Sequence, residues 1–209
     1  MKEAIAKELL SVGAIFLRPE EPFTWASGIK SPIYCDNRLI LSDPAARKKI
    51  EAGLAKLVKT YYPSCQMLMG TSTAGIAHAA ITATKLGLPM GYVRAEAKSH
   101  GRTNRIEGRM EPTTRVVVIE DLISTGGSAL EVVQALREAG AVVLGIASIF
   151  TYGMKQSLDS IEEAGTVNHS LCDLDTLVKV AEKQGYIGAG WKERILRFRD
   201  NPSDESWIK

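Results

Sequence analysis

The segment Val116–Ser128 reads VVVIEDLISTGGS and joins an apolar run, two adjacent acids and a loop of small polar residues. Its first four residues, Val116–Ile119, are all β-branched, which predicts a strand covered on both faces, as in a parallel sheet flanked by helices. Open sheets of this kind bind ligands outside the carboxyl ends of their strands. We therefore expect Glu120 and Asp121 to lie at a ligand-binding edge.

The loop Ser124–Ser128 follows these acids and precedes a segment with helical composition, Ala129–Arg137. Such a loop exposes backbone N–H groups with little side-chain bulk, and the start of a helix attracts anions. Carboxylates accept hydrogen bonds from hydroxyls. The pattern therefore predicts a site for a phosphorylated sugar. The alternative is an ordinary strand-to-helix connection in which the acids only cap the helix.

Strand-like and helix-like segments alternate along the chain, which predicts an α/β fold with a mostly parallel sheet flanked by helices. Apolar runs indicate strands at residues 65–69, 88–93, 115–119 and 141–150. Helical periodicity and start signals indicate helices at residues 5–12, 44–62, 74–86, 127–139, 173–184 and 191–199.

The composition is that of an ordinary globular protein. At 209 residues the chain suits one domain with an appended lobe, and a net charge of +2 does not indicate a nucleic-acid partner. The three cysteines are odd in number and lack metal-ligand spacing, which favours reduced thiols. Because no apolar leader or membrane-length run occurs, we expect a cytoplasmic protein without a membrane partner.

A second glycine-containing loop, Gly70–Gly75, follows a predicted strand and precedes a predicted helix, so its amides could contact another anionic group. Its spacing imitates the first half of a nucleotide-binding P-loop. However, Ile76 and Ala77 stand where Lys and Ser or Thr are required, which argues against an NTPase. A purely structural tight turn is the alternative.

Six potential cations lie within sixteen positions: Arg94, Lys98, His100, Arg102, Arg105 and Arg109. Composition alone favours a solvated, mobile loop here.

The thirteen residues Val116–Ser128 resemble the signature of the type I phosphoribosyltransferases at every position. Two further segments, Phe23–Arg38 and Tyr92–Gly108, narrow this to a resemblance to the orotate phosphoribosyltransferases, which spans approximately residues 1–170. The resemblance implies the type I phosphoribosyltransferase fold over residues 1–209. It also implies a small N-terminal hood lobe, formed by approximately residues 1–40 together with part of the C-terminal region.

The implied reaction transfers the 5-phosphoribosyl group of 5-phosphoribosyl 1-pyrophosphate (PRPP) to N1 of orotate. Its products are orotidine 5′-monophosphate and pyrophosphate, in de novo pyrimidine (UMP) biosynthesis. Mg²⁺ is the implied cofactor and is held through PRPP, without direct protein ligands. The resemblance also implies a homodimer with shared active sites, because in this family the loop that spans residues 94–109 here closes over the neighbouring subunit.

Catalytic roles follow from the resemblance for Arg94, Lys98, His100 and Asp121, with Lys98 as the strongest contact to pyrophosphate. PRPP binding is implied for a larger set: Arg94, Lys98, His100, Glu120, Asp121, Leu122, Ile123, Ser124, Thr125, Gly126, Gly127 and Ser128.

Orotate contacts are implied for Ser124, Ser27 and Gly28, although the last two also suit a plain hairpin turn. The chain departs from the family pattern at positions near the pyrophosphate contacts: Ala26, Ala95, Glu96 and Ser99.

Two other functions fit the sequence less well. A PRPP-binding regulator of nucleic acid would need a DNA-binding domain or a basic surface, and no spare domain precedes Phe23. A purine or uracil phosphoribosyltransferase is disfavoured by the FTWxSG and KxH segments.

Overall fold

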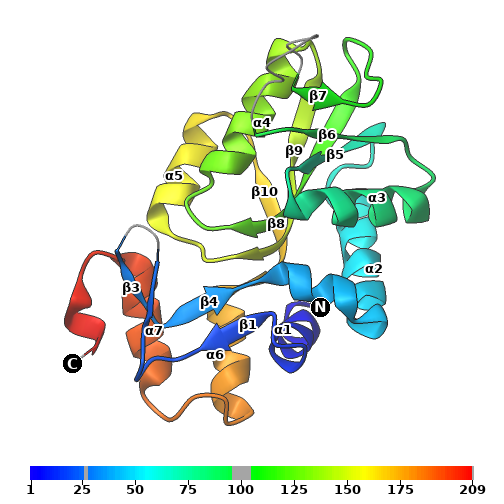
Figure 1. The fold of residues 1–209 in the computed structure, drawn as a ribbon. Helices are drawn as coiled ribbons and strands as arrows, with labels where there is room; N and C mark the ends of the chain where they lie inside the picture. The colour runs from blue at the N-terminus through cyan, green and yellow to red at the C-terminus, as the bar shows by residue number, and fades with distance from the viewer. Residues whose placement is uncertain (26–27, 96–104, 209) are drawn as a thin grey trace.

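The computed structural model describes residues 1–25, 28–95 and 105–208. Its centre is a six-stranded sheet that is parallel except for one edge strand (Figure 1). The strands, in their order across the sheet, are β10 (Asn168–Asp173), β9 (Val142–Thr151), β8 (Arg115–Ile123), β5 (Met67–Thr71), β6 (Met90–Val93) and the antiparallel β7 (Ile106–Glu107). This arrangement confirms the predicted α/β class.

Four helices flank this sheet: α2 (Pro44–Tyr61), α3 (Ala74–Leu86), α4 (Gly127–Glu138) and α5 (Lys155–Glu163). The core has two parts, one with α2 and α3 and the other with α4 and α5. Val117 and Ile119 of β8 belong to the first part, and Val116 and Val118 belong to the second. All four side chains are fully buried. The β-branched run therefore forms a strand covered on both faces, as predicted.

The first and last parts of the chain lie together beside this sheet (Figure 1). Their elements are α1 (Lys2–Ser11), β1 (Ile15–Leu17), β2 (Phe23–Thr24), β3 (Lys30–Ser31), β4 (Ile33–Cys35), the 3-10 helix η1 (Asn37–Ser42), α6 (Leu174–Lys183), α7 (Trp191–Asp200) and the 3-10 helix η2 (Glu205–Ile208). β1 pairs with β4, and β2 pairs with β3, both antiparallel.

Aromatic side chains join these early and late elements. The ring centroids of Trp25 and Phe198 lie 5.7 Å apart, as do those of Phe198 and Trp207. Phe198 and Trp207 belong to the same buried cluster as residues of the large sheet, so the core is continuous. The division into a hood and a main body remains a prediction.

Several elements differ from the predictions, three of them in and around the central sheet. β8 continues to Ile123, so Glu120 and Asp121 lie within the strand and not after it, because β9 pairs with β8 as far as Ile123 and Thr151. The helix α5 and the strand β10 were not predicted. β10 begins with the polar residues Asn168, His169 and Ser170 and lies at the sheet edge, where a strand needs no apolar run.

Two histidines outside the motifs make structural contacts. His78 Nδ1 lies 2.7 Å from Glu51 Oε1, and Thr82 donates a 2.7 Å hydrogen bond to Glu51 Oε2. All three side chains are fully buried and join α2 to α3. His169 stacks on Tyr61 with the ring centroids 3.8 Å apart.

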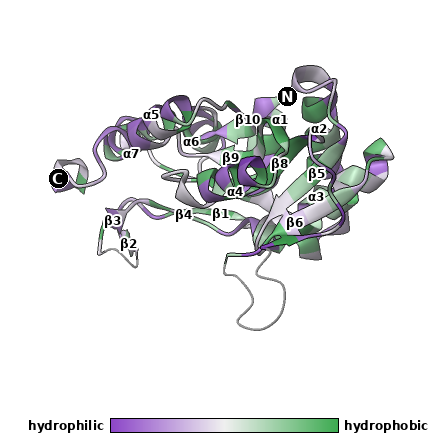
Figure 2. Cartoon of the chain, turned by 90° about the horizontal axis from the view of Figure 1, so that it is seen from above, coloured by the Kyte–Doolittle hydropathy of each residue, from purple (hydrophilic) through white to green (hydrophobic). Residues whose placement is uncertain are grey.

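Hydrophilic residues predominate on the outer helices α5 and α7 (Figure 2). Within the described ranges, every helix is too short or too polar to cross a bilayer. The three cysteines, Cys35, Cys65 and Cys172, are free thiols.

Candidate active site

Glu120 is the most enclosed polar side chain among the predicted site residues that the structure describes, with 4% of its surface exposed. Its Oε1 accepts a 2.7 Å hydrogen bond from the Thr71 hydroxyl and a 2.9 Å bond from the backbone N–H of Asp121. Its Oε2 lies 3.4 Å from the Ser128 hydroxyl. The adjacent Asp121 is only half-buried, as expected for the next residue of a strand, which points to the opposite face.

Burial raises the pKa of Glu120 to about 8, and the neighbouring Asp121 carboxyl adds to the rise through a hydrogen bond and its charge. Two adjacent carboxylates cannot both ionise freely in a buried place. The raised pKa favours the protonated form of Glu120 in the free protein. The pair can then donate to one hydroxyl and accept from another.

The predicted phosphate loop lies directly beyond these acids. Gly126 is the N-cap of α4 with a φ of +87°, a left-handed conformation that favours glycine. Among the described residues, no side chain caps this helix start, so the first-turn amides are available to an anion. A Cβ atom on Gly127 would meet nothing within 4 Å, so the space above it is open.

The two residues between the acids and the loop are held by the core. Ile123 is buried in the part of the core that contains α4 and α5, and Leu122 packs against the part that contains α2 and α3. Contacts from either residue to a substrate would therefore use the backbone. Ser124 is half-buried, whereas Thr125 and Ser128 are exposed.

The loop Gly70–Gly75 lies beside the phosphate loop, because β5 and β8 are neighbours in the sheet. The Ser72 hydroxyl donates a 2.6 Å hydrogen bond to the Val93 carbonyl, and the Ser72–Thr73 peptide is cis. A Cβ atom on Gly75 would lie 2.4 Å from the Ile119 carbonyl oxygen. Close packing of α3 on β8 thus accounts for this glycine without a ligand.

Arg94 follows β6 and lies at the same edge, since β6 pairs with β5 as far as Val93 and Thr71. Its backbone N–H donates to the Arg105 carbonyl at 2.9 Å, and the Arg105 Nε donates to the Arg94 carbonyl at 2.9 Å. The buried Arg94 Nη1 has no hydrogen-bond partner within the described residues, and the Glu107 carboxylate is 3.9 Å away. Lys98 and His100 lie outside the described residues.

Gly28 lies in the turn between β2 and β3, with a φ of +84°. Its N–H donates to the Trp25 carbonyl at 2.8 Å. The backbone here is thus a hairpin turn, the alternative interpretation of this segment, and a contact with orotate remains a prediction. Ser27, the other predicted residue in this turn, lies outside the described residues.

Two residues of the site were missed at the sequence level. The Asn37 side chain donates a 2.7 Å hydrogen bond to the Asp121 carbonyl, which fixes η1 against the acid pair. Thr71 contacts Glu120 as described above. Both residues lie in segments that the sequence singles out, Phe23–Arg38 and Gly70–Gly75, but their contacts join distant parts of the chain: the contact of Thr71 depends on the pairing of β5 with β8, and that of Asn37 on the docking of η1.

The described residues contain no group of three or more His, Cys, Asp or Glu side chains that could hold a metal ion. In the described part of the chain, the paired acids near the loops are Glu120 and Asp121, and Glu120 is enclosed.

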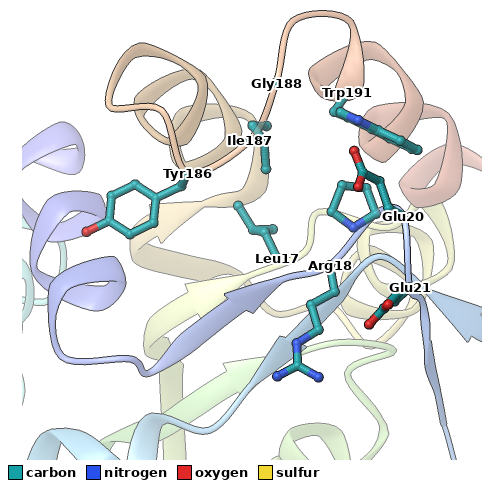
Figure 3. A pocket seen from close by; sticks show the side chains of 9 residues that line it. Leu17, Arg18, Glu20, Glu21, Tyr186, Ile187, Gly188 and Trp191 are labelled. Atoms are coloured by element: carbon teal, nitrogen blue, oxygen red, sulfur yellow. The ribbon is translucent and has the colours of Figure 1, made fainter.

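A separate hollow of ≈ 320 Å³ lies between the end of β1 and the connection from α6 to α7. Figure 3 shows the side chains of Leu17 and Ile187 pointing toward each other within it. None of the predicted site residues lines this hollow. The candidate site is therefore at the carboxyl ends of β8, β5 and β6, and not in this hollow.

The fold and this sheet edge define a class of sugar-phosphate-binding transferase, which agrees with comparisons with known proteins. A family model described as a phosphoribosyl transferase domain matches residues 38–171. A curated protein named orotate phosphoribosyltransferase from Bacillus cytotoxicus is 53% identical over 208 residues, covering 100% of this chain and 99% of the relative. One from Bacillus cereus strain G9842 has the same identity and coverage.

Solved structures of proteins with related names have a similar fold. The orotate phosphoribosyltransferase of Aeropyrum pernix is similar with a TM-score of 0.76 and 29% identity, covering 88% of this chain and 99% of that one. The UMP synthase of Leishmania donovani is similar with a TM-score of 0.81 and 26% identity, covering 95% of this chain and 42% of that one. The chain belongs to the phosphoribosyltransferase family, and within it to the orotate phosphoribosyltransferases.

Proposed function

We propose that this chain transfers the 5-phosphoribosyl group from PRPP to N1 of orotate, giving orotidine 5′-monophosphate and pyrophosphate in pyrimidine biosynthesis. The observation that carries this proposal is that three features lie together at the carboxyl ends of neighbouring strands of the sheet. These are the acid pair Glu120 and Asp121, the uncapped start of α4, and Arg94 at the end of β6. Each suits a different part of PRPP.

The 5-phosphate would bind at the start of α4, where Gly126 and Gly127 carry no side chain and the space at Gly127 is open. Glu120 and Asp121 suit the ribose 2′ and 3′ hydroxyls, which would orient C1 toward orotate. Asp121, the more exposed acid, would also support the positive charge that develops at C1 as pyrophosphate leaves.

The leaving pyrophosphate suits Arg94, whose guanidinium offers a forked pair of donors. From the sequence we assign Lys98 and His100 to the same group. Cations on the leaving group lower the barrier, and exclusion of water suppresses hydrolysis of PRPP. The loop Gly70–Gly75 would add backbone amides.

Mg²⁺ fits this site as a companion of PRPP. The ion keeps several waters and demands octahedral oxygen ligands, which two adjacent acids, one of them enclosed, do not supply alone. When bound with PRPP, it would neutralise charge on the pyrophosphate. The half-buried Asp121 is the carboxylate available to its waters.

For orotate we propose Ser124 beside the phosphate loop, together with Ser27 and Gly28 in the hairpin turn. We further propose a homodimer in which the loop spanning residues 94–109 completes the partner's site. The three free thiols support a reducing compartment, and we place the enzyme in the cytoplasm.

The test is pyrophosphate release from PRPP and Mg²⁺ with a panel of bases. We expect release that depends on orotate and is absent with hypoxanthine, adenine or uracil. Activity with another base but not orotate would overturn the specificity. Binding of PRPP without turnover of any base would instead favour a regulator.

A further inference from the structure

Thr71 is the last residue of β5, and only 2% of its surface is exposed. Its hydroxyl oxygen lies 2.7 Å from Glu120 Oε1 and 3.3 Å from the Ile119 carbonyl oxygen. A hydroxyl has a single proton to donate, and the shorter contact with the carboxyl is the stronger bond. Thr71 therefore bonds across the sheet to the acid on β8.

This bond leaves the two oxygens of Glu120 in different situations. Oε1 accepts short hydrogen bonds from both Thr71 and the Asp121 backbone, whereas Oε2 accepts a long one, 3.4 Å, from Ser128. Oε2 is thus the oxygen less firmly held by hydroxyl and backbone donors, and the one that a ligand hydroxyl can engage. Its position is set by what holds Oε1.

Packing also holds the Thr71 hydroxyl itself in place. A Cβ atom on Gly75 would lie 2.4 Å from the Thr71 hydroxyl oxygen, so the first turn of α3 lies directly against it. The hydroxyl is the point at which β5, β8 and α3 meet. It joins the loop Gly70–Gly75 to Glu120 of the acid pair. Glu120 in turn contacts Ser128 in the first turn of α4.

We propose that Thr71 is a positioning residue for ribose binding: its hydroxyl orients Glu120 so that Oε2 meets a ribose hydroxyl. The residue also couples the loop proposed for pyrophosphate to the acids proposed for ribose. This inference deepens the proposed function and rests on it.

The chain offers a matched control in Thr82, another buried threonine that donates a 2.7 Å hydrogen bond to a buried glutamate, Glu51. Thr71→Val and Thr82→Val remove the same hydroxyl from similar surroundings. Only the first contacts the acid pair. Loss of stability without a specific role would affect both variants alike.

The measurement is PRPP affinity by calorimetry in the presence of Mg²⁺, with the KM for PRPP and kcat as a second readout. Thr71→Val should weaken PRPP binding about tenfold or more, the loss expected for a hydrogen bond to an ionisable group. Thr71→Ser, which keeps the hydroxyl, should stay within about threefold of wild type, and Thr82→Val within about twofold. The KM should rise more than kcat falls.

A double-mutant cycle tests the route of the effect. In a Glu120→Ala background there is no carboxyl to orient, so adding Thr71→Val should cost much less than tenfold. An undiminished loss there, a loss shared equally by Thr82→Val, or unchanged binding by Thr71→Val would each overturn the proposal.

The two proposals fail in different ways. A wild-type protein that binds PRPP but shows no orotate-dependent turnover overturns the proposed reaction alone, because the affinity contrast still tests Thr71. A wild-type protein that does not bind PRPP overturns both.

Discussion

Glu120 binds its proton more tightly in the folded protein than in the unfolded chain, because burial and Asp121 raise its pKa to about 8 from 4.5. The folded state therefore holds more protons between these two values, and the stabilisation from this group is lost as pH rises through that window. The slope from one such group is at most about 1.4 kcal/mol per pH unit.

We predict that Glu120→Gln removes this contribution. Urea unfolding of wild type and variant at pH 5, 6, 7 and 8 gives the difference in free energy of unfolding at each pH. Subtracting the variant cancels the titrating groups that lie away from the acid pair, and the wild-type excess should fall steadily from pH 5 to 8. A difference that is flat over this window would show that Glu120 is already ionised at pH 5.

At the level of elements, two helix starts contain glycines for different reasons. Gly127 opens α4 with free space around it, whereas Gly75 in the first turn of α3 lies against the Ile119 carbonyl. A side chain at Gly127 is thus tolerated by the fold but blocks an anion, and one at Gly75 is not tolerated by the fold.

We predict that Gly127→Val weakens PRPP binding about tenfold or more while the free energy of unfolding changes by at most about 1 kcal/mol. Gly75→Ala should lower that free energy by about 1–3 kcal/mol or more, through overpacking against backbone. Calorimetry with PRPP and urea unfolding measure the two effects. Near-normal PRPP affinity in Gly127→Val would show that this loop is only a turn.

The helices and strands of the sheet were predictable where local signals agree. The predicted bounds of the helix at residues 74–86 match α3, which ends at a left-handed Gly87. α5 was missed because it is only nine residues long and has two apolar side chains, Leu158 and Ile161, of which Leu158 is exposed. The contact between Thr71 and Glu120 joins residues 49 positions apart, and only the strand order reveals it.

For the whole molecule, we predict that each active site is shared across a homodimer. Lys98→Ala and Asp121→Asn proteins should each be nearly inactive. After subunit exchange, half of the dimers should be mixed, and one of the two sites in each mixed dimer should carry neither change. Activity should then approach about a quarter of wild type. Persistent inactivity despite proven exchange would place Lys98 in its own subunit's site.

The aromatic contacts that join Trp25 to Phe198 link residues made at opposite ends of synthesis. During translation, the residues of β2 and β3 are synthesised early, and Trp25 cannot pack against Phe198 until α7 has been synthesised. Before that, the apolar ring of Trp25 lacks this contact on the nascent chain. We therefore expect chaperones to bind the nascent chain near Trp25, and the enzyme to reach its substrate-binding form only late in translation.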